Sequence, residues 1–487
     1  MISATENTHW QSFYANSITR QIHLLISLIK KNKKAPDTLI NHFGSILAIF
    51  DEGISHPDPA TRFALIDFVR TLHPLPLWWG KWTEWMLVMD KVTKIAQEAE
   101  EINSLIWLAL TQSEILIIGG DAKKALLGAK KALHLATSHH NPEMVFKAEM
   151  AVFEAEKDLG LIGDRINAIT ALEEALYVKK NQLPEKVFQA LEVEFLLKKT
   201  DVLRRMKLEN DAVTTIQKAY ALASESLDED NPLIAQIYNR RGATYWTAEK
   251  SDLAIADFEK ATEIFKNWGD QASQVYSKGY IGLIFWSTGK YKQAEKILQS
   301  SISMAEEIKA FQWQAIQTGN LGLVKFLRGR LAQAIALMEQ HHRLSQLINN
   351  RAEAERANAN IGYTQIYLGD FQDAHQRISQ YLAYTEEMQF HIGTGVACAN
   401  MAWAMDGLGD TDSALEYAEK TLSIAKKTNA HLLEIVALRS MSELQKDLSS
   451  KVRYAEAVRT LAKKHSRRFN EAGALLTLAD CHQDENL

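Results

Sequence analysis

The chain has few of the residues that stabilise small secreted proteins or build catalytic centres. Only two cysteines occur among its 487 residues, Cys398 and Cys481, which is too few for a disulfide framework and lacks the spacing of a metal site. The sequence also contains no H-E-x-x-H, G-x-S-x-G or G-x-x-x-x-G-K-[ST] motif. We therefore expect a cytoplasmic protein with no metal, no cofactor and no enzymatic activity.

Charge and hydropathy argue against two classes of partner. The formal net charge is -5 and the isoelectric point is about 6.3, whereas a nucleic-acid-binding protein normally carries a strongly basic face. Apolar runs, such as Leu105–Leu110, end well before the length needed to cross a bilayer. The polar N-terminus does not resemble a signal peptide. We expect no nucleic acid and no membrane as a partner, and no export.

Proline is absent from more than half of the chain. All eight prolines lie at or before Pro232, so the last 255 residues contain none. Proline interrupts helices because it lacks an N–H donor and clashes with the preceding turn. The C-terminal half is therefore free to be helical, broken only by short groups of glycine, asparagine and aspartate.

A repeat of 40 residues runs through this proline-free region. A column of small residues recurs at that step, and a column of alanines follows twelve residues later. The first column is Gly242, Gly282, Gly322, Gly362 and Ala402, and the second is Ala254, Ala294, Ala334, Ala374 and Ala414. Apolar residues at three-to-four spacing on both sides of a tight turn predict a helical hairpin in each unit. Such hairpins stack into a solenoid because none can bury its apolar face alone.

The pattern continues with looser spacing outside this region. Upstream repeats of 42 to 44 residues contain Ala125, Ala168 and Ala212, and a downstream repeat contains Ala455. We predict an all-α fold, a right-handed superhelical solenoid of about nine hairpins with N- and C-terminal capping helices. The predicted division is an N-terminal helical cap over 1–55, irregular repeats over 56–234, in-register repeats over 235–434, and a last repeat with a capping helix over 435–487.

The spacing of glycine, aromatic residues and alanine resembles the tetratricopeptide repeat. The residues that carry the resemblance include Gly282, Phe285, Gly289, Tyr291 and Ala294. The usual unit has about 34 residues. The longer spacing and the triplets that begin with Asn320, Asn360 and Asn400 resemble the variant found in kinesin light chain-like adaptors and in the regulatory arms of bacterial signalling ATPases. The resemblance covers roughly residues 60 to 465 and implies a protein-binding solenoid.

In repeats of this kind the first helix of each hairpin lines the concave surface. The predicted partner-binding residues are therefore Arg240, Trp246, Tyr280, Trp286, Asn320, Asn360, Tyr363, Asn400 and Trp403. A ladder of asparagine amides can pair with the main chain of an extended peptide whatever its sequence, and aromatic neighbours can anchor side chains. In the alternative interpretation the asparagines bond neighbouring helices, and Trp246 and Trp286 belong to the core.

Two hypotheses of function follow. The first is a non-enzymatic scaffold that binds a peptide or an extended protein segment in the concave groove. The second is a sensor or regulatory subunit that controls a separate effector, such as an ATPase, a protease or a transcription factor. It is motivated by the segment Trp79–Trp85, which is similar to the start of bacterial regulatory arms. The tryptophans of this region, Trp78 included, form either a hydrophobic plug or a partner site. An enzyme with an unrecognised site is a remote third hypothesis.

Overall fold

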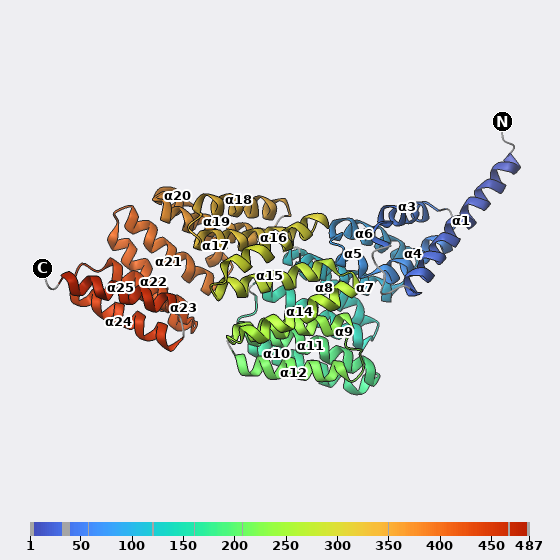
Figure 1. The fold of residues 1–487 in the computed structure, drawn as a ribbon. Helices are drawn as coiled ribbons and strands as arrows, with labels where there is room; N and C mark the ends of the chain where they lie inside the picture. Colours follow the sequence, from blue (N-terminus) through green and yellow to red (C-terminus); the bar gives the residue numbers. More distant parts are fainter. Residues whose placement is uncertain are drawn as a thin grey trace. The chain divides into compact units, whose positions relative to one another are not determined.

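The chain is helical throughout the part that its computed structural model describes, which is residues 4–31, 39–56, 58–118, 121–159, 161–206, 208–348, 350–465 and 468–484. Helices follow one another through short turns (Figure 1). The all-α prediction is therefore confirmed. Within these ranges, no helix combines the length and the apolar character that crossing a bilayer requires.

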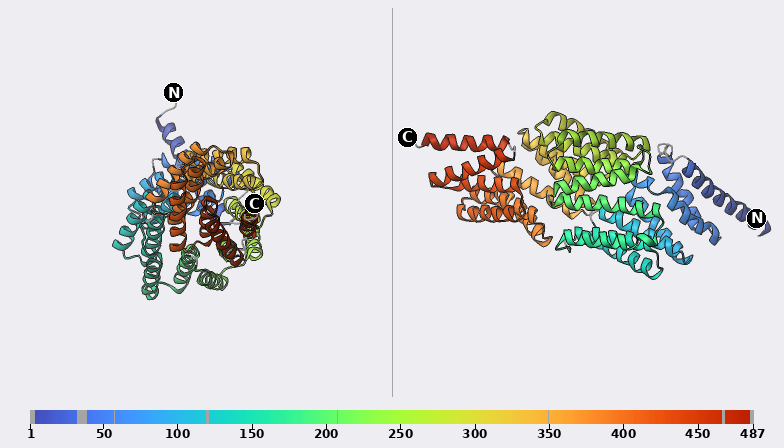
Figure 2. Two further views of the ribbon diagram at one scale, coloured as in Figure 1. Left: turned by 90° about the vertical axis from the view of Figure 1, so that its left-hand side faces the viewer. Right: turned by 90° about the horizontal axis from the view of Figure 1, so that it is seen from below.

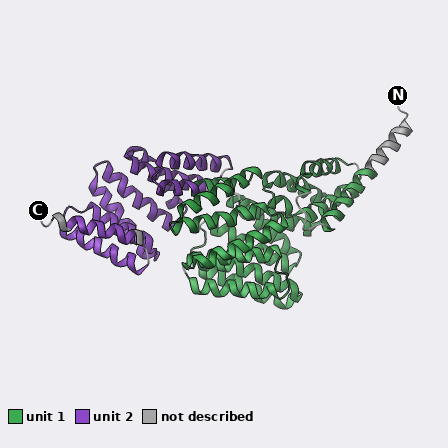
Figure 3. Cartoon of the chain, in the orientation of Figure 1, with its two compact units in different colours: residues 1–320 green, residues 321–487 purple. Residues whose placement is uncertain are grey.

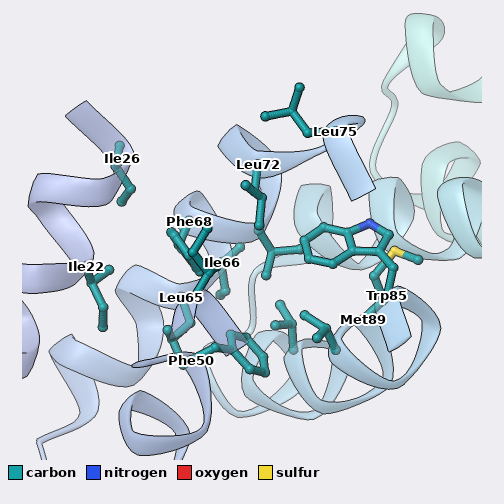
Figure 4. Packing of buried hydrophobic residues seen from close by; sticks show 14 of the residues in the cluster. Ile22, Ile26, Phe50, Leu65, Ile66, Phe68, Leu72, Leu75, Trp85 and Met89 are labelled. Carbon is teal, nitrogen blue, oxygen red and sulfur yellow. The ribbon is translucent and has the colours of Figure 1, made fainter. Parts of the chain in front are cut away.

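The residues before the first hairpin form a group of helices around an apolar core of their own. They are α1 (Ala4–Lys31), α3 (Phe43–Ile54), α4 (Pro59–Leu72), α5 (Leu75–Trp78) and α6 (Trp82–Glu98). Ile22 and Ile26, one turn apart on α1, are buried in the same cluster as Phe50 and Leu65 (Figure 4). Pro36, where proline would be expected to interrupt the helical cap, lies outside the described residues.

The described residues after α6 form nine hairpins, and the helices of each pair run antiparallel (Figure 2). The N-terminal hairpins are α7 (Ile102–Ile118) with α8 (Ala122–Ser138), α9 (Pro142–Asp158) with α10 (Arg165–Val178), α11 (Glu185–Arg205) with α12 (Glu209–Ser224), and α13 (Pro232–Thr247) with α14 (Ser251–Trp268). The others are α15 (Gln271–Ser287) with α16 (Tyr291–Glu307), α17 (Phe311–Leu327) with α18 (Leu331–Leu347), α19 (Arg351–Leu368) with α20 (Phe371–Glu387), α21 (His391–Gly407) with α22 (Thr411–Lys427), and α23 (His431–Leu444) with α24 (Leu448–Lys464). The last helix is α25 (Arg468–Asp484).

The column of small residues marks where the two helices of a hairpin meet. A Cβ atom added to Gly282 on α15 would lie 2.7 Å from Cγ of Leu298 on α16, whose side chain has no exposed surface. The other glycines of the column meet large residues in the same register, which are Phe258, Met338 and Ile378. Where the column holds Ala402, the residue in that register is Ala418. Small residues therefore face large ones, which keeps the contact closely packed.

Left-handed backbone conformations recur with the repeat. Gly289 has a φ of 77° in the turn within its hairpin, a conformation that glycine adopts without strain because it has no Cβ atom. The turns between hairpins also need positive φ, but there Lys309, Gln389 and Asn429 supply it, at 56°, 50° and 49°. The rule is not general, because Glu249 has a φ of 60° in the turn within the hairpin of α13 and α14, and Gly269 has a φ of 68° in the turn between α14 and α15. A residue other than glycine at such a position is mildly strained in either kind of turn.

The chain divides into two compact units, residues 1–320 and residues 321–487 (Figure 3). Within each unit the first helices of successive hairpins contact one another, as α11 does α13 in unit 1 and α21 does α23 in unit 2. Second helices of successive hairpins make no contact of that extent among the described residues. Because inner elements of a curved stack lie closer together than outer ones, the first helices line the concave side of each unit.

The tryptophan cluster near α5 is part of the packing of unit 1. Trp79 and Trp85 are each 1% exposed. Trp78 makes an edge-to-face contact with Trp268 at the end of α14, with 6.2 Å between the ring centroids, and Gly80 lies against Ile308. The start of the array therefore packs against a hairpin far along the sequence, which supports the hydrophobic-plug interpretation.

Candidate partner-binding surface

The predicted partner-binding residues all lie on first helices, but the unit boundary divides them into two sets. Those in unit 1 are Arg240 and Trp246 on α13, Tyr280 and Trp286 on α15, and Asn320 on α17. Those in unit 2 are Asn360 and Tyr363 on α19, and Asn400 and Trp403 on α21. Each set belongs to the concave surface of its own unit.

An aromatic cluster lies at one end of the unit 2 set. Tyr363 and Tyr367 are one turn apart on α19, with 5.3 Å between their ring centroids and 3.1 Å between their hydroxyl oxygens. The ring of Phe326 lies 5.1 Å from that of Tyr363 and 5.0 Å from that of Tyr367. Burial raises the pKa of Tyr363 well above its ordinary value, so this hydroxyl stays protonated at neutral pH. Tyr367 is 53% exposed and offers its ring to solvent.

A cation and an indole ring form the other end of this set. The guanidinium carbon of Arg439, on α23, lies 5.8 Å from the ring centroid of Trp403 on α21. Arg439 Nε donates a hydrogen bond of 2.8 Å to Oε1 of Glu443, one turn later. Its charge also counteracts the rise in the pKa of Tyr363, which places it near both aromatic residues. The ion pair and the cation–π contact fix the orientation of the half-buried indole.

Asn360 and Asn400 occupy equivalent positions on α19 and α21, three residues before Tyr363 and Trp403 respectively. Both side chains are half-buried, and neither amide has a hydrogen-bond partner among the described residues. Asn358 differs, because its Nδ2 donates to Gln380 Oε1 at 2.7 Å and its Oδ1 accepts from Arg377 Nη1 at 2.8 Å. Packing within unit 2 therefore uses Asn358 and leaves the other two amides free to bond with a ligand.

Asn320 does not share this arrangement. It is only 4% exposed, and its Nδ2 donates a hydrogen bond of 3.1 Å to Oε1 of Gln317 on the same helix. Of the three asparagines in the predicted ladder, Asn320 therefore follows the alternative interpretation, in which the amide is used inside the protein. The structure places only Asn360 and Asn400 on one surface with unpaired amides.

The aromatic residues predicted in unit 1 pack mainly against one another. The ring of Tyr280 is stacked on Phe258, with centroids 5.0 Å apart, and meets Trp246 edge-on at 5.7 Å. The indole of Trp246 donates a hydrogen bond of 3.4 Å to Ser287 Oγ. Trp286 is half-buried, and its Nε1 is shielded from solvent without a hydrogen-bond partner. These contacts support the core interpretation for both tryptophans.

We call the surface formed by Asn360, Tyr363, Asn400, Trp403 and Arg439 the amide face. Packed helices lie about 8–10 Å apart, so the two asparagines are separated by about three residues of an extended chain. An amide supplies both a donor and an acceptor and so matches the two hydrogen-bonding groups of a peptide unit. The amide face can therefore hold a peptide main chain at two points, with aromatic rings of Tyr363 and Trp403 on the same helices.

Arg439 and Tyr367 are not among the residues that the repeat pattern predicts for partner binding. The two preceding repeats have alanine at the position of Arg439, at Ala359 and Ala399. The sequence could have indicated Arg439, because a charged residue there replaces a small one. Tyr367 lies two residues before the turn glycine Gly369, and neither column of the repeat includes it. Its exposed ring becomes visible only once the helix is placed.

The structure offers no metal or thiol chemistry in the part of the chain that it describes. No group of three or more histidine, cysteine, aspartate or glutamate side chains could hold a metal ion there. Cys398 has no exposed surface, and burial raises the pKa of its thiol to about 11. Cys398 is therefore a small core residue.

Family models of the tetratricopeptide repeat match residues 197–267 and 281–308. These matches confirm the tetratricopeptide-repeat resemblance seen in the sequence, and the stacked hairpins have the all-α architecture that the resemblance implies. No curated protein sequence matches the chain significantly.

Solved structures share the fold at low sequence identity. A Rap protein complexed with competence and sporulation factor is 12% identical, with a TM-score of 0.51, over 78% of this chain and 98% of that one. The Rap conjugation gene regulator of plasmid pLS20, in complex with a Phr peptide, is 14% identical, with a TM-score of 0.52, over 75% and 97%. A signal transduction ATPase with a tetratricopeptide-repeat sensor, from Pyrococcus horikoshii, is 13% identical, with a TM-score of 0.43, over 72% and 55%.

Proposed function

We propose that this protein is a non-enzymatic cytoplasmic scaffold that binds an extended peptide across the amide face of unit 2. The observation that carries the proposal is the pair of unpaired amides, Asn360 and Asn400, on adjacent first helices. The polar atoms of both amides reach solvent, and a peptide main chain would replace water as their hydrogen-bond partner. Tyr363 and Trp403 would then contact side chains of the peptide.

The amide face sets limits on what the peptide must supply. Two main-chain anchors read no side chain, so sequence preference must come from the aromatic rings and from Arg439. An apolar or aromatic residue suits the exposed ring of Tyr367, and an acidic residue suits the part of the Arg439 guanidinium that Glu443 leaves available. We therefore expect modest sequence preference and strong dependence on an extended conformation.

The test is capture of peptides from a synthetic random octapeptide library by the immobilised full chain. The Asn360→Ala, Asn400→Ala double variant should capture at least tenfold less peptide, with thermal unfolding little changed. The matched control is Gln372→Ala, Gln376→Ala, which removes two exposed amides from the second helix α20. Equal capture by all three proteins, or loss of capture together with a large loss of stability, would contradict the proposal.

A second role, control of a separate effector protein, is compatible with the same site. It is supported by the fold likeness to a conjugation gene regulator whose structure contains a peptide. A peptide on the amide face would then change the affinity of the protein for the effector. The effector would change the affinity for the peptide by the same factor, because linkage is reciprocal. Co-purification from native lysate, with and without a captured peptide, tests this role. If the protein binds the peptide but the set of co-purified proteins does not change, the regulatory role is contradicted and only the scaffold role stands.

A further inference from the structure

The last hairpin of unit 2 carries a charge that the rest of the chain lacks. Residues 446–468, which include α24, contain eight lysine or arginine residues but two aspartate or glutamate residues, a net charge of +6. The whole chain has a formal net charge of -5, so its other residues together carry -11. A strongly basic segment therefore lies within an acidic protein.

Two pairs of lysines end successive second helices in this part of unit 2. Lys426 and Lys427 are the last residues of α22, and Lys463 and Lys464 are the last residues of α24. All four side chains are exposed, and none forms an ion pair among the described residues. Because every hairpin is antiparallel, α22 and α24 run in the same direction. Both lysine pairs therefore lie at the edge of unit 2 that contains the turns between hairpins.

A stacked pair of histidines lies between the two lysine pairs. His431 begins α23, directly after the turn that follows α22, and His465 directly follows α24. Their rings are nearly parallel, with an interplanar angle of 20° and 4.1 Å between the centroids. This contact holds the end of α24 against the start of α23. We call the surface at this edge of unit 2 the basic edge, and it consists of Lys426, Lys427, His431, Lys463, Lys464 and His465.

The helix dipole and the repeat do not explain these lysines. Cations are favoured at the C-terminal end of a helix, and the second helices of all repeats present the same kind of end. At the positions equivalent to Lys426 and Lys427, however, residues 306–307 of α16 and 386–387 of α20 are glutamates. The sign of the charge therefore reverses along the edge, and the lysines are specific to the last repeats.

The glutamates at the end of α20 are neutralised within the protein, unlike the lysines. Glu386 Oε1 accepts a hydrogen bond of 2.9 Å from Lys420 Nζ. The carboxylate of Glu387 accepts two hydrogen bonds from the Arg351 guanidinium, of 3.1 and 2.8 Å. Unit 2 therefore compensates its acidic residues at this edge and leaves the basic ones uncompensated.

Carboxyl groups beside the basic edge are fewer than its cations. The first turn of α23 contains Glu434, and the first turn of α25 contains Glu471. Glu456, on α24, already pairs with Arg459 at 3.3 Å. The four lysines therefore exceed the two remaining carboxyl groups by two positive charges, and their exposed ammonium groups are available to an acidic ligand.

Two features favour an acidic polypeptide over a nucleic acid as this ligand. Leu432, next to His431, is 51% exposed and offers apolar contact surface beside the cations. A nucleic acid would make more phosphate contacts, typically about 6–10, and would extend from four lysines onto a chain whose other residues are acidic in sum. A short segment with acidic and apolar residues can contact the basic edge alone.

We infer that the basic edge is a docking surface for an acidic segment of a partner protein. Aspartate or glutamate side chains of the partner would lie against the two lysine pairs, and an apolar side chain against Leu432. Lysine is a flexible point charge without the planar fork of arginine, so the surface would select its partner by charge more than by geometry. That the partner is the effector rests on the regulatory role proposed above, whereas the binding of an acidic segment does not.

Fluorescence anisotropy of a labelled acidic peptide, titrated with the full chain, tests the inference. The probe is a dodecapeptide of three Glu-Glu-Leu-Glu repeats, and its matched control has glutamine in place of every glutamate. The acidic peptide should bind saturably and the glutamine peptide should not. Raising the NaCl concentration from about 50 to about 200 mM should weaken binding severalfold, because exposed charges are screened. Equal binding of the two peptides would overturn the inference.

Paired substitutions locate the binding on the protein. Lys463→Glu with Lys464→Glu should weaken binding of the acidic peptide at least tenfold, and Lys463→Arg with Lys464→Arg should retain it. The control, Lys292→Glu with Lys296→Glu, makes the same change of net charge at exposed positions of α16 and should leave binding nearly unchanged. An equal loss in the control would show attraction by net charge alone and would overturn the docking surface.

Two further measurements exclude the other occupants. The Asn360→Ala, Asn400→Ala variant should bind the acidic peptide as wild type does, whereas a loss of binding would place that peptide on the amide face. A single-stranded dodecanucleotide should bind more weakly than the peptide, and equal or tighter binding that depends on Lys463 and Lys464 would assign the surface to nucleic acid instead. Failure of the basic edge in any of these tests leaves capture of library peptides by the amide face untouched.

Discussion

Exchanging residues across the contact between α15 and α16 tests why glycine recurs every 40 residues. In wild type, an alanine Cβ at position 282 would lie 2.7 Å from both Cγ and Cδ2 of Leu298. Overpacking of this kind costs about 1–3 kcal/mol, and replacing glycine by alanine inside a helix returns about 1 kcal/mol. Gly282→Ala should therefore destabilise this hairpin, by up to about 2 kcal/mol.

The same substitution should stabilise the hairpin once Leu298 is small. Leu298→Ala alone should cost about 2–5 kcal/mol. In that background the new methyl group enters the vacated space, so burial of about 0.8 kcal/mol adds to the helix propensity, and Gly282→Ala becomes favourable by about 1–2 kcal/mol. The chain already contains this combination, because Ala402 is followed in the same register by Ala418.

Hydrogen exchange of the amides in α15 and α16, followed by mass spectrometry, measures the effect locally. A local measurement is needed because a long repeat protein does not unfold in two states. The four proteins of the cycle should give a coupling energy of about 1–4 kcal/mol, with amides of unit 2 unaffected. If Gly282→Ala lowers protection equally in both backgrounds, the glycine column is not set by packing against the second helix.

Three further predictions concern turns, pH and thiols. Gln389→Gly should stabilise the turn before α21 by about 0.5–1 kcal/mol, since the exposed Gln389 has a φ of 50°. Gly369→Ala, at a φ of 82° with no atom near the added Cβ, should destabilise its turn by a similar amount. Hydrogen exchange of the helices that flank each turn checks both, and unchanged protection in both variants would refute the strain. Burial raises the pKa of Asp270 from 3.8 to about 7. Between pH 4 and 7 the native state therefore holds a proton that the unfolded state has lost, and the free energy of unfolding falls as the pH rises through this range. Asp270→Asn, which keeps a capping side chain, should reduce this pH dependence of stability, and an unchanged dependence would contradict the raised pKa of Asp270. Cys398 and Cys481 are both fully buried, so a thiol reagent should modify them only after unfolding, and rapid reaction of the native protein would contradict that burial.

The hairpins could be predicted because their determinants are local and periodic. Gly282 and Ala294 report a close helix contact, and Gly289 reports a turn, whatever surrounds them. The boundary at residues 320 and 321 could not be predicted, because Gly322 and Ala334 continue the same register across it. The contact of Trp78 with Trp268 depends on the number of hairpins between the two residues and on the total curvature of that stack. A local sequence pattern does not specify either quantity.

The candidate site was only partly predictable for a related reason. Register places Asn320, Asn360 and Asn400 at equivalent positions, but the use of each amide depends on its neighbours. Asn320 has Gln317 within hydrogen-bonding distance, and the corresponding residues of the next two repeats, Ala357 and Ala397, have no group to accept from an amide. The same reasoning applied to the sequence would have separated Asn320 from the other two.

The most direct test of the account is to observe the side-chain amides of Asn360 and Asn400 while a captured peptide is added to asparagine-labelled protein. Resonances are assigned by single Asn→Ala variants, and Asn358 serves as an internal control because its amide is already bonded to Gln380 and Arg377. We predict that the peptide shifts the NH2 resonances of Asn360 and Asn400 saturably and leaves those of Asn358 in place. Peptide binding with no change at Asn360 and Asn400 would contradict the assignment of the amide face as the peptide-binding surface.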